Sequence, residues 1–291
     1  MEKIKFSVII PAYNEQDTVL TTINKLKEYL QLNFANHYEI IVVNDGSNDK
    51  TAEILNQMND SEIKVINHPY NKGYGASIKT AVAASIMNWI LVFDADGQHK
   101  IEDIGRLIQS SDGFDMVVGS RQGYKGPLVR QPGKKIILWV AQYLVEKKIP
   151  DLNSGLRLIK KEYFNKYAHL LPSGFSWTTT ITLAFLKENL NVDYIPIEIS
   201  KRQGGRSMVK TSDAVKALML ILRMIMLFSP LRVFLPVSFV LFAIGCISAF
   251  PEILIPNIND STILLFISSL IIFFFGTIAD QIAAIRREIN K

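Results

Sequence analysis

The chain has 291 residues, of which 48% are apolar and 20% are charged, and its formal net charge at pH 7 is +5. This composition excludes a disordered chain, and so small a net charge is not typical of a nucleic-acid-binding protein. Only four charged residues lie between Leu231 and Ile285. We therefore expect a soluble head of about 210–230 residues followed by a membrane anchor.

The first half of the chain alternates between short apolar runs and helix-length segments. Strands are expected at 6–11, 39–43, 63–66, 89–93 and 115–118. Helices are expected between them at 17–32, 49–58, 75–87 and 101–110, with Ser47 or Asp49 capping the second and Asp103 near the start of the fourth. Apolar strands that alternate with helices predict an α/β fold with a mostly parallel sheet covered on both faces.

Polar residues follow three of these strands, namely 13–15, 44–47 and 94–99. Because ligands bind at the carboxyl ends of parallel strands, the three groups predict a site at one edge of the sheet. Asp94 and Asp96, separated by one small residue, suit Mg²⁺ or Mn²⁺ that bridges the protein to phosphate oxygens. The sequence contains neither a P-loop motif nor a Gly-x-Gly-x-x-Gly motif at the first helix, which argues against P-loop and Rossmann cofactor chemistry.

The cysteine, the histidines and the N-terminal residues provide no further candidate for the site. Cys246 is the sole cysteine, so no disulfide can form within the chain, which fits a head in a reducing compartment. No signal peptide is expected, because the N-terminal residues 1–5 contain no apolar core. The histidines show no metal-ligand spacing and are expected to be structural or solvent-facing: His37, His68, His99 and His169.

Two apolar segments, 231–250 and 261–279, are long enough to cross a bilayer, and the second can extend to Ile285. The loop 251–260 between them has no Lys or Arg, whereas basic residues precede the first span and follow the second. The positive-inside rule therefore predicts cytoplasmic chain ends and an outer loop. The alternative is a pair of buried helices in a large soluble domain. Upstream, 212–228 is expected either as a helix in the membrane interface or as a core helix of the head.

Three motifs, Ser7–Glu15, Val42–Ser47 and Asp94–His99, resemble glycosyltransferase family 2, whose members have the GT-A fold. Three further motifs, Asn71–Gly75, Gly119–Arg121 and Ser154–Arg157, make the chain most similar to the polyprenyl-phosphate branch of that family. This branch includes dolichyl-phosphate mannose and glucose synthases and bacterial undecaprenyl-phosphate transferases. The resemblance covers about residues 6–210, and the two spans resemble the anchor that some members carry.

The resemblance implies a domain organisation and a location. It implies a GT-A catalytic domain over 1–210, an amphipathic interfacial helix over 211–230, two transmembrane helices over 231–285 with the outer loop 251–260, and a basic cytoplasmic tail over 286–291. It also implies an integral protein of a bacterial or archaeal-type plasma membrane, with a cytoplasmic catalytic domain that serves cell-envelope glycan synthesis. Relatives with this anchor form homo-oligomers.

The resemblance also assigns site residues, position by position. Nucleotide binding would fall to Pro11, Tyr13, Glu15, Asp45, Asn71 and Gly73. The metal ion, Mg²⁺ or Mn²⁺, would be held by Asp94, Asp96 and Gln98. The catalytic residues would be Asp94, Asp96, Arg121, Arg130 and Arg157, with Arg121 and Arg130 meeting the phosphates from a loop that reshapes on binding. The acceptor phosphate would contact Lys134, Arg157, Arg202 and Arg206. Some bacterial relatives have an Asp where this chain has Gly155, so a base role for that Asp does not transfer.

The resemblance implies transfer of a hexose from a UDP- or GDP-linked donor to a polyprenyl phosphate. A lipid phosphate is already an anion at pH 7 and needs no general base, whereas a sugar hydroxyl does. The many arginines fit electrostatic catalysis and an inverting displacement. The alternatives are transfer to a protein or glycan hydroxyl with Asp151 as the base, and a membrane scaffold without turnover. A processive synthase is disfavoured because the Gln-x-x-Arg-Trp motif is missing and two spans cannot form an export channel.

Overall fold

The computed structural model describes residues 4–58, 60–121, 131–174, 176–200, 212–254 and 259–288. The chain divides into two compact units. The first comprises Met1–Leu138 and Lys147–Lys210, and the second comprises Trp139–Glu146 and Thr211–Lys291. The second unit therefore contains a short segment, Trp139–Glu146, that a boundary at residue 210 would assign to the head.

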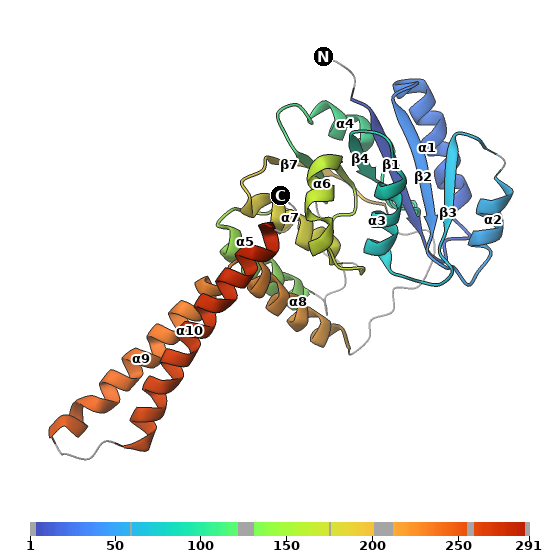
Figure 1. Cartoon of the computed structure of the whole chain (residues 1–291). Helices are drawn as coiled ribbons and strands as arrows, with labels where there is room; N and C mark the ends of the chain where they lie inside the picture. The colour runs from blue at the N-terminus through green and yellow to red at the C-terminus, as the bar shows by residue number, and fades with distance from the viewer. Residues whose placement is uncertain are drawn as a thin grey trace. The chain divides into compact units, whose positions relative to one another are not determined.

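The first unit is built on a seven-stranded sheet with the order β3-β2-β1-β4-β6-β5-β7 (Figure 1). Its strands are β1 (Phe6–Ala12), β2 (Tyr38–Asn44), β3 (Ile63–Asn67), β4 (Trp89–Val92), β5 (Met116–Arg121), β6 (Arg157–Lys160) and β7 (Val192–Ile197). Every pairing is parallel except those of β6, which runs antiparallel to both β4 and β5. The predicted α/β fold with a mostly parallel sheet is confirmed.

Helices cover both faces of this sheet, as apolar strands require. The helices of the first unit are α1 (Val19–Phe34), α2 (Thr51–Gln57), α3 (Tyr74–Ala84), α4 (Asp103–Gln109), α6 (Lys161–Tyr167), the 3₁₀ turn η2 (Ala168–Leu170) and α7 (Trp177–Lys187), and α5 (Gln131–Val145) belongs partly to each unit. Phe6, Val8 and Ile10 of β1 join one core cluster with residues of α1, α2 and α4. The alternate residue Ile9 is equally buried and points to the opposite face, where α3 packs on β1 and β2.

The predicted elements lie close to the observed ones, and the differences concern their ends. Lys50 occupies the cap position of α2, although Asp49 Oδ1 accepts a hydrogen bond from the Thr51 main-chain N–H at 2.9 Å. Asp103 is the first residue of α4 and pairs with Arg106 at 2.6 Å. The first helix begins at Val19 rather than at residue 17, and in the turn before it the main-chain oxygen of Glu15 accepts hydrogen bonds from the N–H groups of Thr18 and Val19.

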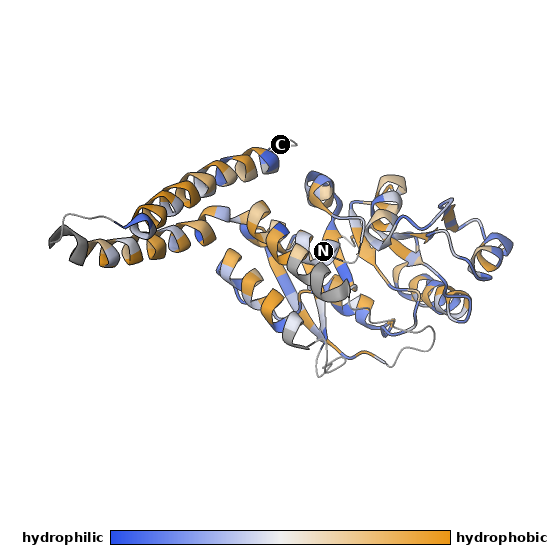
Figure 2. Ribbon diagram, turned by 90° about the horizontal axis from the view of Figure 1, so that it is seen from below, coloured by the Kyte–Doolittle hydropathy of each residue, from blue (hydrophilic) through white to orange (hydrophobic). Residues whose placement is uncertain are grey.

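The second unit contains α8 (Ser212–Phe228) and a hairpin of α9 (Pro230–Leu254) and α10 (Asp260–Glu288). The hairpin helices run side by side (Figure 1) and are apolar along most of their length (Figure 2). Two segments, Pro230–Phe250 and Asp260–Arg286, are long and apolar enough to cross a membrane. Only 11% and 22% of the residues in their most apolar windows are buried, so the alternative of two core helices of a soluble domain is not supported.

Small and hydroxylated side chains hold the hairpin together. Ser238 Oγ donates to the main-chain oxygen of Ser269 at 3.0 Å, and Ser269 Oγ donates to that of Ser238 at 2.9 Å. Ser248 and Thr262 hydroxyls lie 2.7 Å apart. A Cβ at Gly276 would lie 2.6 Å from Cβ of Phe234, so the helices approach closely there. Such contacts are typical of helices that associate within lipid.

The helix α8 resolves one of the alternatives left open by the sequence. It belongs to the unit that contains α9 and α10 and contacts both of them. Met224 and Leu227 are buried, whereas Met219, Leu222 and Met226 are exposed. These contacts do not support a core helix of the head, and the position of α8 in a membrane interface stays a prediction.

Candidate functional site

The carboxyl ends of β1, β2 and β4 lie at one edge of the sheet, as the sequence predicts. Ala12 pairs with Asn44 at the ends of β1 and β2, and the loops that follow are joined to each other. The Asn14 main-chain N–H donates to Ser47 Oγ at 3.0 Å, and the Asn48 N–H donates to Asn14 Oδ1 at 2.8 Å. Asn14 has a positive φ of 56°, which turns the chain away from the strand. The polar residues of the two motifs therefore form one surface.

The residues assigned to the nucleotide differ in how they face this surface. Tyr13 is 40% exposed and Asn71 is exposed, whereas Pro11 is buried within β1. Glu15 is nearly buried at the start of α1, where its main-chain N–H donates to Thr51 Oγ1 at 2.9 Å and its Oε2 accepts from Thr18 Oγ1 at 3.2 Å. Tyr13 and Asn71 are thus the accessible members of the set, and the nucleotide contacts stay predictions.

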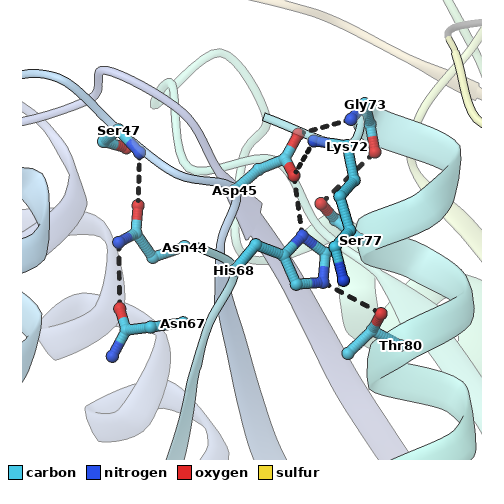
Figure 3. Close-up of polar contacts among 9 residues, drawn as sticks. All are labelled: Asn44, Asp45, Ser47, Asn67, His68, Lys72, Gly73, Ser77 and Thr80. Carbon is cyan, nitrogen blue, oxygen red and sulfur yellow. Dashed lines mark hydrogen bonds and ion pairs between the residues drawn. The ribbon is translucent and has the colours of Figure 1, made fainter. Parts of the chain in front are cut away.

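Asp45 is only 3% exposed, and protein donors contact both of its carboxylate oxygens (Figure 3). Oδ1 accepts from the Lys72 main-chain N–H at 2.9 Å and from His68 Nδ1 at 2.7 Å. Oδ2 accepts from the Gly73 main-chain N–H at 2.8 Å. His68 Nε2 lies 3.0 Å from Thr80 Oγ1, so the imidazole ring bridges Asp45 and Thr80. Asp45 therefore holds the turn that begins α3.

This turn places Tyr74 against Asp94. Gly73 occupies the cap position of α3 with a φ of 100°, and a Cβ there would lie 2.6 Å from the main-chain oxygen of Ser173. The Tyr74 hydroxyl donates to Asp94 Oδ1 at 2.5 Å. Burial, together with the Asp94 charge, raises the pKa of Tyr74 well above its usual value, so the hydroxyl remains a donor at neutral pH. Tyr74 lies within the motif Asn71–Gly75 but was not predicted as a site residue.

The two aspartates predicted to hold a metal follow β4 directly. Asp94 Oδ2 lies 3.4 Å from His99 Nε2, and the side chain of Asp94 keeps a quarter of its surface exposed. Although burial acts to raise the pKa of Asp94, hydrogen bonds from His99 and Tyr74 and the charge of Arg121 lower it. Asp96 Oδ1 accepts from the Gln98 main-chain N–H at 3.1 Å. Asp94 is thus kept ionised, as a metal ligand requires.

The donor set at this position fits a hard divalent cation. Asp94, Asp96 and Gln98 provide side-chain oxygens within five consecutive residues after the strand. The described residues contain no cluster of three or more His, Cys, Asp or Glu side chains arranged as a metal cage. Mg²⁺ is commonly bound by one or two carboxylates and by substrate phosphates rather than by a full protein cage. The residues therefore suit a metal ion that a bound diphosphate helps to coordinate.

Arg121 ends β5, which is parallel to β4 through the intervening β6, so its side chain starts from the same edge of the sheet. Its Nε donates to Asp151 Oδ2 at 2.7 Å, and its second guanidinium nitrogen, NH2, donates to Oδ1 at 2.9 Å. The main-chain N–H of Arg121 also donates to Asp151 Oδ2 at 3.1 Å. Asp151, which the alternative with a hydroxyl acceptor requires as a general base, is therefore the ion-pair partner of Arg121.

Arg157 lies elsewhere than predicted. Its side chain is fully buried, and it donates to the main-chain oxygens of Ser154 and Leu152 at 2.7 and 3.0 Å and to Thr182 Oγ1 at 2.6 Å. Burial lowers the pKa of Arg157 to about 10. The predictions that Arg157 is a catalytic residue and that it contacts the acceptor phosphate are corrected accordingly, because no part of this side chain reaches the surface. Arg157 instead holds the segment that precedes β6, which includes Gly155.

Several predicted site residues lie outside the described part of the structure. Arg130, Arg202 and Arg206 are not among the described residues. The main chain of Lys134 belongs to α5, but its side chain is not described. The predicted contacts of these four residues with phosphates therefore stay predictions.

Comparisons with known proteins identify the two parts of the chain. Residues 7–168 match Glycosyl transferase family 2, and residues 229–285 match the GtrB C-terminal hairpin. The first match spans the sheet edge with its aspartates, and the second spans most of α9 and α10.

Three curated relatives of this chain are named as transferases that act on polyprenyl phosphates. A UDP-N-acetylglucosamine–dolichyl-phosphate N-acetylglucosaminyltransferase of Methanococcus voltae is 29% identical over 243 residues, which cover 73% of this chain and 94% of the relative. A dolichyl-phosphate beta-glucosyltransferase of Dictyostelium discoideum is 28% identical over 224 residues, covering 69% and 67%. An undecaprenyl-phosphate 4-deoxy-4-formamido-L-arabinose transferase of Salmonella choleraesuis is 33% identical over 161 residues, covering 54% and 49%.

The fold is shared with glucosyl-3-phosphoglycerate synthase from Mycobacterium tuberculosis, solved in complex with Mn²⁺, UDP and phosphoglyceric acid. The TM-score is 0.61 at 16% identity, and the similarity covers 76% of this chain and 78% of the synthase. At this identity the likeness concerns the fold alone. The family match, which spans more than half of the chain, together with the aspartates that follow β4, shows that this chain belongs to glycosyl transferase family 2.

Proposed function

We propose that the chain is a membrane-anchored glycosyltransferase that moves a hexose from a UDP- or GDP-linked donor to the phosphate of a polyprenyl phosphate. Membership of glycosyl transferase family 2 supports the reaction class. The acceptor is supported by relatives whose names give dolichyl phosphate or undecaprenyl phosphate. The hairpin match and the two apolar helices support the membrane anchor.

The observation that carries this proposal is the state of the carboxylates at the sheet edge. Asp94 accepts a hydrogen bond from Tyr74 and lies against His99. Both carboxylate oxygens of Asp151 accept hydrogen bonds from Arg121. Although burial acts to raise it, the pKa of Asp151 is lowered by hydrogen bonds and charge from Arg121, so Asp151 is a poor proton acceptor at neutral pH. A site with cations and engaged carboxylates fits an acceptor that is already an anion. It does not favour a hydroxyl acceptor with Asp151 as the base.

The reaction is an inverting single displacement. An oxygen of the acceptor phosphate forms a bond to the anomeric carbon from the face opposite the leaving group, and the bond from that carbon to the nucleoside diphosphate breaks with its electron pair. The step balances without a proton transfer. Arg121 would neutralise charge on the diphosphate, together with Arg130, while Lys134, Arg202 and Arg206 would hold the acceptor phosphate. A divalent cation held by Asp94, Asp96 and Gln98 would neutralise further charge on the leaving group.

The membrane arrangement follows from the acceptor. A polyprenyl phosphate exposes its phosphate only at the headgroup plane, so the catalytic domain, 1–210, must lie close to that plane. We assign 211–230 to the interface, 231–285 to two spans with the outer loop 251–260, and 286–291 to a cytoplasmic tail. Arg232, Arg286 and Arg287 flank the spans on the side of the chain ends. This distribution supports a cytoplasmic head in a bacterial or archaeal-type plasma membrane.

A lipid-extraction assay tests the proposal. The full chain, purified in detergent, is incubated with Mn²⁺, undecaprenyl or dolichyl phosphate, and radiolabelled UDP-glucose, UDP-N-acetylglucosamine or GDP-mannose in turn. We expect label from one donor in an organic-extractable lipid that mild acid hydrolyses. Omission of the lipid phosphate is the control. Label that appears only in protein or in water-soluble glycan would overturn the proposal in favour of a hydroxyl acceptor.

A further inference from the structure

Asp151 contacts Arg121 in a way that determines the direction of the arginine side chain. The two planar groups meet through two parallel hydrogen bonds, Nε to Oδ2 and NH2 to Oδ1. A third hydrogen bond joins Oδ2 to the main-chain N–H of the same residue. The carboxylate is itself oriented, because Oδ1 accepts from the Asn153 main-chain N–H at 2.9 Å. The Arg121 guanidinium is thus fixed relative to the end of its own strand.

This fixed guanidinium starts from the sheet edge at which the aspartates after β4 lie, because β4 and β5 run in the same direction on either side of β6. Arg121 keeps 20% of its side chain exposed, whereas Asp151 keeps 11%, so the carboxylate is the more enclosed partner. Holding an arginine side chain in one geometry costs it rotamer freedom. A partner that holds it before a ligand arrives removes part of that cost from binding.

We propose that Asp151 is a positioning residue that directs Arg121 towards the diphosphate of the nucleotide-sugar donor. The inference rests on the proposed function for the identity of the donor, whose diphosphate is the anion that Arg121 would contact. Asp151 does not contact the ligand itself and transfers no proton. Asp151 affects binding only by orienting Arg121. A general base would instead accept a proton, and an ordinary buried ion pair would stabilise the fold without affecting diphosphate binding in particular.

Binding measurements on the full chain separate these roles. The probes are UDP and GDP with Mn²⁺, compared with uridine and guanosine, which lack the diphosphate. In the Asp151→Ala variant we expect the Kd of the bound nucleoside diphosphate to rise by about tenfold or more, because the guanidinium loses its orientation. The Kd of the corresponding nucleoside should not change. If Asp151→Ala fails to fold, the Asp151→Asn variant, which preserves the shape of the side chain, replaces it. It should likewise raise the Kd of the nucleoside diphosphate and leave the Kd of the nucleoside unchanged.

A double-mutant cycle with Arg121 provides the decisive comparison. If Asp151 acts through Arg121, Asp151→Ala should have no further effect on diphosphate binding in an Arg121→Ala background. Asp115 offers a matched control, since its side chain is also 11% exposed and pairs with Lys160 at 2.8 Å, next to the opposite end of β5. The Asp115→Ala variant should bind the nucleoside diphosphate as the parent does.

Three outcomes with the variants would overturn the inference. Equal losses of nucleoside and diphosphate binding would indicate a general structural role for Asp151. Additive effects in the cycle would show that Asp151 acts independently of Arg121. Loss of turnover with unchanged diphosphate binding, accompanied by a changed acidic limb of the pH profile, would indicate a base. If the parent binds neither UDP nor GDP, the inference fails with the donor site. If it binds one with the expected coupling but transfers no sugar to lipid, the proposed acceptor fails and the inference stands.

Discussion

Gly155 lies so close to Asp94 that a Cβ at position 155 would overlap the Oδ2 atom of the aspartate. The same Cβ would lie 3.3 Å from the Tyr74 hydroxyl. The segment before β6 therefore closes one side of the carboxylate that is predicted to hold the metal, and only a residue without a side chain fits. In this chain a carboxylate at position 155 could not coexist with Asp94 in its present position.

The Gly155→Ala variant tests this close packing. The added methyl group must displace Asp94 or the main chain of the segment, at a cost of about 1–3 kcal/mol. If that cost falls on the bound state, metal-dependent binding of the nucleoside diphosphate should weaken by roughly tenfold to a hundredfold. Calorimetry measures this change in affinity. Gly174→Ala is the matched control, because a Cβ there would meet no atom within 4 Å. Unchanged Mn²⁺-dependent binding in Gly155→Ala would contradict the assignment of Asp94.

The hydrogen bond from Tyr74 to Asp94 leads to a second prediction. Hydrogen bonds to charged groups contribute about 1.5–3 kcal/mol, so Tyr74→Phe should loosen Asp94 and weaken Mn²⁺-dependent nucleotide binding. The phenylalanine retains the ring that lies 6.2 Å from the Trp177 ring, so packing is preserved. Tyr38→Phe, at the start of β2 and hence at the opposite edge of the sheet, serves as the control. Equal Mn²⁺ dependence in the Tyr74→Phe variant and the parent would show that this bond does not orient the aspartate.

The sequence predicted which strand ends would meet, but not which side chains would remain accessible there. Three polar strand ends on one edge follow from parallel topology, and the edge was correctly predicted. Whether Asp45 faces a ligand or the protein depends on the loop at residues 72–73, which lies 27 positions away. The burial of Arg157 depends in the same way on α7, because Thr182 accepts its hydrogen bond. Such partners cannot be predicted from the local pattern.

The fold shows a similar division. The strands of the first half were predicted from their apolar runs, and β1 to β4 each lie within one residue of the expected bounds. The antiparallel β6 was not predicted, since Arg157–Lys160 is a short strand of mixed residues inserted between β4 and β5. Local periodicity contains no information on such an insertion. Its position nevertheless matters to the site, because it places Gly155 next to Asp94.

Donor and acceptor sites should respond separately to substitution. Asp96→Ala should abolish metal-dependent donor binding, since a single remaining carboxylate holds a divalent cation weakly in competition with water. Arg202→Ala should leave donor binding unchanged and reduce transfer to the lipid phosphate. Calorimetry with Mn²⁺ and nucleotide, followed by the lipid-extraction assay, measures the two effects on the same preparations. Turnover by Asp96→Ala equal to that of the parent would refute the metal site, and weakened donor binding in Arg202→Ala would refute the acceptor role.

His68 supports the turn that begins α3, because it donates to Asp45, which accepts from Lys72 and Gly73. His68→Ala leaves a buried carboxylate with one donor fewer, and such losses cost about 1–3 kcal/mol. We expect faster hydrogen exchange at the main-chain amides of residues 72 and 73 and a lower unfolding temperature of the head. His68→Asn, whose side-chain amide can replace Nδ1 as the donor, should lie closer to the parent. Unchanged exchange at both amides in His68→Ala would show that Asp45 holds the turn without the histidine.

The predicted topology can be tested with the single native cysteine removed. In a Cys246→Ala background, Asn257→Cys places a thiol in the loop 251–260, and Lys291→Cys places one in the basic tail. If both chain ends are cytoplasmic, a membrane-impermeant maleimide should label the Asn257→Cys variant in intact cells and the Lys291→Cys variant only after lysis. The reverse pattern would place the head on the outer face. A head on that face would be separated from the cytoplasmic pool of nucleotide sugars, so the same labelling experiment also tests whether this chain can use the proposed donor.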